Sequence, residues 1–167
     1  SKSEVLTVIQ GNSVNNEVQT PIAIEEDVYS ASYPGTKVEM SRVAEFLTWT
    51  GGADNALWSD SDNWNLPDSP SSGDILRFPD EVTSGNYTAK NDISNNLDID
   101  RITFSDAQGS DNSYTIGGSG GITGVLLRNG IINNSAAEHN IDLDITLIGN
   151  ATVEADSGSL NLCGIDH

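Results

Sequence analysis

Apolar and polar residues alternate with a period of two through much of the second half of the chain. The clearest examples are residues 97–104 and 141–148, where Leu or Ile takes turns with Asp or Thr. Such alternation predicts strands that bury one face. After residue 64 no segment has a helical period, so the predicted fold class is all-β. Shorter β-prone runs, bounded by Gly, Asn, Asp or Ser, lie at residues 74–78, 86–89, 113–116, 122–127, 131–132, 151–154 and 159–162.

One internal echo suggests how these strands are arranged. The pattern of residues 96–100 returns at residues 140–144, 44 positions later. Two turns of about 22 residues would produce this offset, which is typical of a β-solenoid whose coils stack at a spacing of ~4.8 Å. An antiparallel β-sandwich is the alternative, because its strands also alternate. The carboxylates expected to point outward, opposite their apolar neighbours, are those of Asp98, Asp100, Asp142 and Asp144.

The first 46 residues have a different character. Residues 4–10 form a β-prone run near the N-terminus, and residues 11–16 have the composition of a turn or linker. Such a strand either folds back onto its own domain or adds to a sheet edge of the next subunit. We therefore expect an N-terminal extension over residues 1–46 and a short β-solenoid over residues 47–167. The apolar residues assigned to the candidate assembly strand are Val5, Leu6, Val8 and Ile9.

All three tryptophans, Trp49, Trp58 and Trp64, fall in one short passage at the start of the predicted solenoid. The ends of a solenoid need caps, and each aromatic ring can bury on the order of 200 Å². The passage is thus predicted to cap the first coil. The functional alternative is a glycan platform, because the face of a tryptophan ring suits a sugar ring.

The same passage resembles the opening of bacterial autotransporter-associated β-strand repeat proteins. The resemblance is carried by Trp49-x-Gly51, Trp58, Asn63-Trp64, a Pro-containing loop and residues 74–78. Residues 102–104, 114–118, 121–122 and 158–162 follow the same layout, so the likeness covers about residues 48–162. It implies a right-handed parallel β-helix on a secreted or surface-displayed protein, usually a stalk or passenger without a catalytic signature.

The composition limits the partners. The chain has 25 Asp plus Glu against seven Lys plus Arg, a net charge of −18 and a pI near 4.1. Phosphate backbones and anionic membranes repel such a surface, so we expect no nucleic acid as partner. No apolar run approaches the ~18 residues that span a bilayer, so membrane insertion is not expected. The expected partners are further copies, other surface proteins or a polysaccharide, in a secreted or cell-surface location.

Few residues of the sequence are candidates for metal binding or catalysis. Asp60 and Asp62 begin an acidic loop that could bind Ca²⁺, although it lacks the glycine and the bidentate glutamate of an EF-hand. No other cofactor is expected. His139 precedes a strand in polar company, which predicts an exposed loop histidine. Cys163 is the only cysteine, so it forms no intrachain disulfide and is expected to be a small buried residue.

No Ser-His-Asp arrangement is visible, and we predict no enzyme. A carbohydrate-active β-helix enzyme is the distant alternative, with Arg101 and Arg128 as its interior basic candidates. The prediction is an extracellular structural module of a bacterial surface or matrix assembly, a filament subunit joined through its N-terminal strand. A glycan-binding or adhesive module that uses the tryptophans is the alternative.

Overall fold

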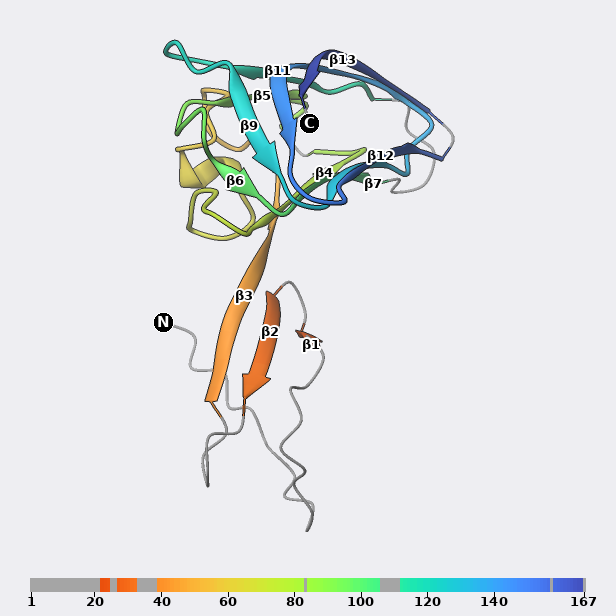
Figure 1. Cartoon of the computed structure of the whole chain (residues 1–167). Helices are drawn as coiled ribbons and strands as arrows, with labels where there is room; N and C mark the ends of the chain where they lie inside the picture. The colour runs from red at the N-terminus through yellow and green to blue at the C-terminus, as the bar shows by residue number, and fades with distance from the viewer. Residues whose placement is uncertain are drawn as a thin grey trace.

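A computed structural model describes residues 22–24, 27–32, 39–82, 84–105, 112–156 and 158–166, with side chains from residue 46 onward (Figure 1). These residues are almost entirely strands and loops. The single helical segment among them is a short 3₁₀ turn, η1 (Ser61–Asn63). The described ranges contain no helix of the length and apolarity that a bilayer crossing requires. Val5, Leu6, Val8 and Ile9 lie outside the described residues.

Three strands form an antiparallel ribbon before the main body. They are β1 (Ile22–Ile24), β2 (Asp27–Ser32) and β3 (Glu39–Thr48), with β2 paired to both neighbours. β3 takes part in both the ribbon and the body. Its first part pairs with β2, while its last three residues pair in parallel with β4 (Ile75–Pro79) inside the body. The ribbon therefore leaves the body along the direction of one of its own strands (Figure 1).

The first sheet of the body has the strand order β3-β4-β7-β10-β12, and every pairing along it is parallel. Its other members are β7 (Arg101–Ser105), β10 (Gly130–Asn133) and β12 (Thr152–Ala155). The predicted alternative of an antiparallel sandwich is therefore wrong. Alternation of apolar and polar residues is the same in both arrangements, so it did not separate them.

The second sheet is also parallel, and it is curled. Its strands are β5 (Thr88–Asn91), β6 (Asp98–Ile99), β8 (Thr115–Gly118), β9 (Gly124–Leu127), β11 (Glu138–Leu147) and β13 (Ser159–Asp166). The long strand β11 pairs through its first part with β8 and through its last part with β9, while β13 follows β11 along both parts. β11 thus connects the part of the sheet that contains β8 to the part that contains β9.

The chain returns to each sheet at similar intervals. In the first sheet Ile75 pairs with Arg101, 26 positions later, and Gly130 pairs with Thr152, 22 positions later. We call each such interval a repeat. The exact register differs from the predicted one, because Asp98 pairs with Leu126, whose next partner is Thr146, 48 positions after Asp98. Repeats of unequal length produce this difference. The 44-residue spacing of the sequence pattern therefore gave the strand register only approximately.

The apolar faces of the two sheets form one core. The predicted inward residues Ile99, Ile141 and Leu143 are fully buried, and Asp142 and Asp144 point outward as predicted. The larger aliphatic and aromatic members of the core are Leu47, Leu76, Phe78, Ile102, Phe104, Tyr114, Ile116, Leu127, Ile131 and Ile145.

Asn129-Gly130 marks the passage from the second sheet to the first, from β9 to β10. Gly130 has φ +83°, a conformation that L side chains rarely adopt, and a Cβ there would overlap the backbone carbonyl of Thr152. Glycine is required on both grounds. The dipeptide turns a corner between sheets and does not close a hairpin.

Candidate functional site

The three tryptophans lie inside the molecule, next to the first parallel strands. Trp49 is 1% exposed, Trp58 0% and Trp64 4%. We call these three residues the tryptophan cluster. Trp49 directly follows β3, and Leu57, next to Trp58, forms a parallel bridge with Lys90 of β5. The cluster therefore covers the side of the core where both sheets begin.

Ring contacts and backbone hydrogen bonds hold the tryptophan cluster together. Trp64 meets Trp49 edge-to-face at a centroid distance of 5.1 Å and Trp58 at 6.4 Å. The Trp64 Nε1 donates to the Trp58 carbonyl at 2.9 Å, and the Trp49 Nε1 donates to the Asn86 carbonyl at 3.0 Å. Among the described residues, the buried Trp58 Nε1 has no hydrogen-bond partner. A sugar ring would reach these faces only if the cluster opened.

Of the two predicted calcium ligands, Asp60 bonds to the local backbone and to a neighbouring side chain. Asp60 caps the 3₁₀ turn η1, where its Oδ1 accepts from the Asp62 N–H at 3.1 Å. Its Oδ2 accepts from the Asn55 Nδ2 at 2.6 Å. Within the described residues, no group of three or more His, Cys, Asp or Glu side chains is arranged to hold a metal ion. Calcium binding at Asp60 and Asp62 stays a prediction.

His139 is fully buried, so the prediction of an exposed loop histidine was wrong. It is the second residue of β11 and stacks on Phe104 at a centroid distance of 4.0 Å with an interplanar angle of 10°. Burial lowers its pKa from 6.5 to about 4, which keeps the imidazole neutral near pH 7. The inward alternation of Ile141 and Leu143, extended back by one step, was the signal for this position.

The hydrogen bonds of His139 fix its tautomer. Its Nδ1 accepts the backbone N–H of Tyr114 at 3.1 Å, so the ring proton is on Nε2. That proton points to the Ser135 Oγ, 2.7 Å away, and the Ser135 hydroxyl donates to the Asn133 Oδ1 at 2.9 Å. The histidine therefore donates to the serine, opposite to the direction needed for a nucleophilic serine. This buried chain of polar groups links β11 to Asn133 at the end of β10.

Two buried asparagines end strands in the same way, and sequence reasoning missed both. Asn91 ends β5 and Asn133 ends β10. Each side-chain oxygen accepts backbone N–H groups of the turn that follows. Each amide donates to a carbonyl of that turn and to a carbonyl of a later repeat, Gly124 for Asn91 and Ser159 for Asn133. In so asparagine-rich a chain, no sequence signal singles them out.

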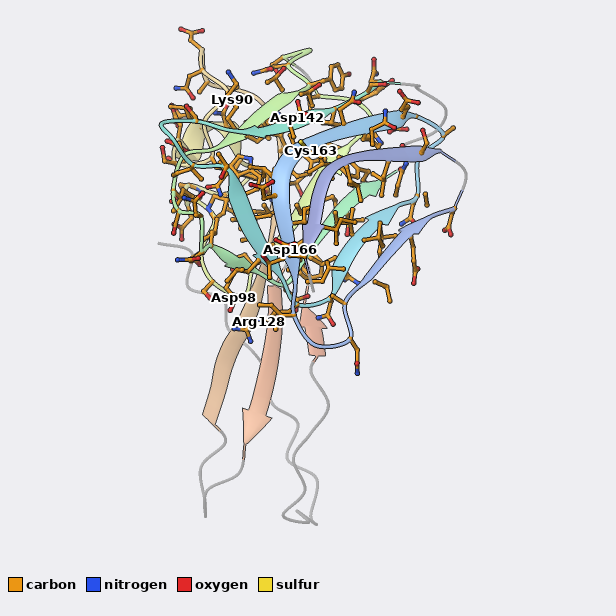
Figure 2. The ribbon with its side chains drawn as sticks, turned by 45° about the horizontal axis from the view of Figure 1, so that its top comes forward. Lys90, Asp98, Arg128, Asp142, Cys163 and Asp166 are labelled. Carbon is orange, nitrogen blue, oxygen red and sulfur yellow. The ribbon has the colours of Figure 1, made fainter. Side chains whose placement is uncertain are left out.

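The two basic residues of the alternative enzyme hypothesis have different surroundings. Arg128 forms a two-point ion pair with Asp98 on the surface, through its Nε at 2.7 Å and its Nη2 (Figure 2). This hydrogen bond from Arg128 lowers the pKa of Asp98 below its usual value. Arg101 lies on β7, where its Nε is buried with no hydrogen-bond partner among the described residues. The Arg128 charge is thus paired with a carboxylate, and the enzyme hypothesis stays a prediction.

In the described residues, inward positions of β12 and β13 are partly exposed. β12 pairs only with β10, and β13 pairs only with β11, in the part of the chain that the structure describes. Val153 on β12 is 37% exposed although its partner Ile131 is fully buried. Ile165 on β13 is 39% exposed although its partner Ile145 is 1% exposed. We call β12 and β13 the open edge.

Cys163 lies on this open edge and is exposed, so the prediction of a buried thiol was wrong. It follows Leu162, the partner of Ile141, and therefore extends the outward side of the sheet beside Asp142 (Figure 2). Burial of a small residue needs a neighbouring layer, and none of the described residues supplies one on the outward face of the sheet here.

In comparisons with protein-family models, curated proteins and solved structures, no match to this chain was found.

Proposed function

We propose that the protein is a structural module of a bacterial surface or matrix assembly, secreted or displayed at the cell surface. In this proposal its body is a short right-handed parallel β-helix, and its subunits join through the N-terminal strand into a filament. The resemblance of residues 48–162 to autotransporter-associated β-strand repeats is part of the basis for the proposal.

The observation that carries the proposal is the repeated parallel pairing in both sheets. Thr88 pairs with Thr115, Thr115 with Asn140, and Asn140 with Asn161, so the same row is visited four times. Between these returns the chain also passes through the first sheet, where β4, β7, β10 and β12 pair in parallel. A chain that returns to parallel partners in this way makes crossover connections, and such connections are right-handed in nearly all proteins.

The proposed mechanism is geometric. Stacked repeats give a stiff body whose interior is closed by side chains from both sheets. Asn91 and Asn133 strengthen it, since each ties its own turn to a later repeat. The buried histidine and serine support the structural interpretation, because their hydrogen bonds run toward the backbone and toward Asn133. The molecule would then act through its shape and stiffness and not by catalysing a reaction.

Assembly of the pure chain tests this function. We expect electron microscopy and size-exclusion chromatography to reveal ordered polymers of the full chain. Removal of residues 1–11 is expected to leave folded monomers. Replacement of an apolar residue of the strand, Val8→Asp, is expected to act like the deletion, and Gln10→Asp serves as the matched control at the polar end of the run. Monomeric full-length protein at all concentrations, or polymers that persist without residues 1–11, would contradict the proposal.

A further inference from the structure

We propose that two copies of the chain contact each other through faces of opposite charge. One copy contributes the outward side of the first sheet, and the other contributes the outward side of β11. The strands that form both faces lie within the described residues. The inference goes beyond the proposed function, because this contact does not use the N-terminal strand.

Two arginines lie on the outward side of the first sheet. Arg77 is on β4, and Arg101 is on β7 opposite Ile75, two residues before Arg77. Paired residues, and residues two apart on one strand, point to the same side of a sheet. Leu76 and Ile102, between them, are fully buried, so both arginines point away from the core. We call the outward side of β4 and β7 the basic face.

The two arginines of the basic face have no carboxylate partner among the described residues. Neither Arg77 nor Arg101 forms an ion pair there, whereas Arg128 is paired with Asp98. The Arg77 Cζ lies 5.3 Å from the centroid of the Phe46 ring on the same face. Both arginines are partly exposed, so the carboxylates of a partner can approach them.

The row of side chains that contains Arg77 has one acidic member, at a distance. Arg77 pairs with Thr103, Thr103 with Ile132, and Ile132 with Glu154. Glu154 is therefore three strands from Arg77, roughly 14 Å at the usual strand spacing. A separation above ~10 Å is largely screened at physiological salt, so Glu154 does not neutralise the basic face.

The outward side of β11 has the opposite charge. Glu138, Asp142 and Asp144 are exposed there (Figure 2). Asp144 pairs with Gly124 on one side and with Gly164 on the other. Glycine has no side chain, so no neighbour in this row covers the Asp144 carboxylate. We call the outward side of β11 the acidic face.

The two faces also match in spacing. Arg77 and Arg101 are diagonal neighbours on adjacent strands, so their Cα atoms are ~8 Å apart. Asp142 and Asp144 are two residues apart on one strand, which separates their Cα atoms by ~6.6 Å. Two ion pairs can therefore form side by side. Because each copy has both faces and uses a different one for each neighbour, the contact is head-to-tail.

The net charge of −18 opposes any contact between copies. At about 0.1 M salt, charges separated by more than ~10 Å are largely screened, whereas pairs in direct contact are screened less. We therefore expect the full chain to associate reversibly at about 0.1 M salt and to dissociate at about 1 M salt. Sedimentation velocity measures both states.

Charge reversal on each face tests the contact. Arg77→Glu with Arg101→Glu makes the basic face acidic, and Asp142→Arg with Asp144→Arg makes the acidic face basic. Each double variant alone should associate at least ~10-fold more weakly than the parent chain, because faces of like charge then meet. An equimolar mixture should recover the association, because each variant presents the charge that the other needs.

Two exposed residues outside these faces provide matched controls. Lys90→Glu and Asp54→Arg change the charge in the same directions and should alter the association by about twofold or less. The series is repeated with Val8→Asp in every chain, which separates the contact from the N-terminal strand. Circular dichroism checks that each variant is folded, and Arg77→Gln with Arg101→Gln replaces the glutamate variant if that variant does not fold.

Three results would overturn the proposed contact: a parent chain that stays monomeric at about 0.1 M salt in the Val8→Asp form, association that charge reversal leaves unchanged, or a mixture that does not recover. Retention of such a monomeric parent on an anionic polysaccharide, lost in the arginine variant, would assign the basic face to that ligand instead. If the mixture recovers but residues 1–11 prove dispensable for polymers, the contact stands and the proposed joining through the N-terminal strand fails.

Discussion

The two ends of the stacked strands are built in opposite ways. At the first strands the tryptophan cluster closes the core, with its three rings at most 4% exposed. At the open edge the same kind of inward position holds Val153 and Ile165, each more than one-third exposed. A stack of strands always leaves two unpaired ends. Within the described residues, the inward rings beside the first strands are buried, and the inward side chains of β12 and β13 are partly exposed.

The closed end should therefore carry far more stability per side chain than the open edge. We expect Trp58→Ala to lower the free energy of unfolding by about 3–5 kcal/mol, because it removes a fully buried ring and leaves a cavity. Val153→Ala should change it by about 0.5 kcal/mol or less, as for an exposed position. Denaturant unfolding followed by circular dichroism of both variants gives the comparison.

The variant Trp58→Ala also decides between the two roles of the tryptophans. If Trp58→Ala kept the stability of the parent chain and lost retention on a polysaccharide column, the cluster would be a glycan platform and not a cap. Trp58→Phe refines the result. It keeps most of the buried ring and removes an Nε1 that has no partner among the described residues, so its cost should be well below that of alanine.

The asparagines extend the comparison to polar groups. Asn133 is fully buried and bonds two carbonyls, whereas Asn161 lies on the open edge and bonds only the Asn140 side chain among the described contacts. Asn133→Ala should cost about 2–3 kcal/mol, because it leaves buried carbonyls and N–H groups without partners. Asn161→Ala should stay within about 0.5 kcal/mol. Similar losses of stability in the two variants, measured by thermal unfolding, would contradict this role of Asn133.

His139 gives a smaller effect that depends on pH. Its pKa is lowered to about 4 in the folded chain, from 6.5, so the unfolded chain binds more protons between these values. The contribution of His139 to stability is complete above pH 6.5 and is lost as the pH falls toward 4. The slope from this one group is at most ~1.4 kcal/mol per pH unit.

The variant His139→Gln isolates that slope. The carboxylates titrate alike in both proteins, so the difference between their stability curves over pH 4–6.5 reports on the histidine. We expect the parent chain to lose stability faster than the variant as the pH falls. Parallel curves would mean that His139 is as easily protonated in the folded chain as in the unfolded one.

Much of this architecture is already specified by local sequence pattern. Alternation at residues 141–148 determines which side chains of β11 are inside, since successive residues of a strand point to opposite faces. The concentration of all three tryptophans before the first repeated strands was likewise enough to mark residues with large rings to bury. The structure shows Asp60 capping a 3₁₀ turn, which the sequence analysis did not predict.

The tertiary structure decided what alternation leaves open: the choice of partners. Parallel pairing, the unequal repeats and the corner asparagines all depend on which backbone groups from distant segments meet. His139 and Cys163 were assigned the wrong exposure for the same reason. A residue is buried only if another layer covers its face, and a single strand carries no information on whether that layer exists.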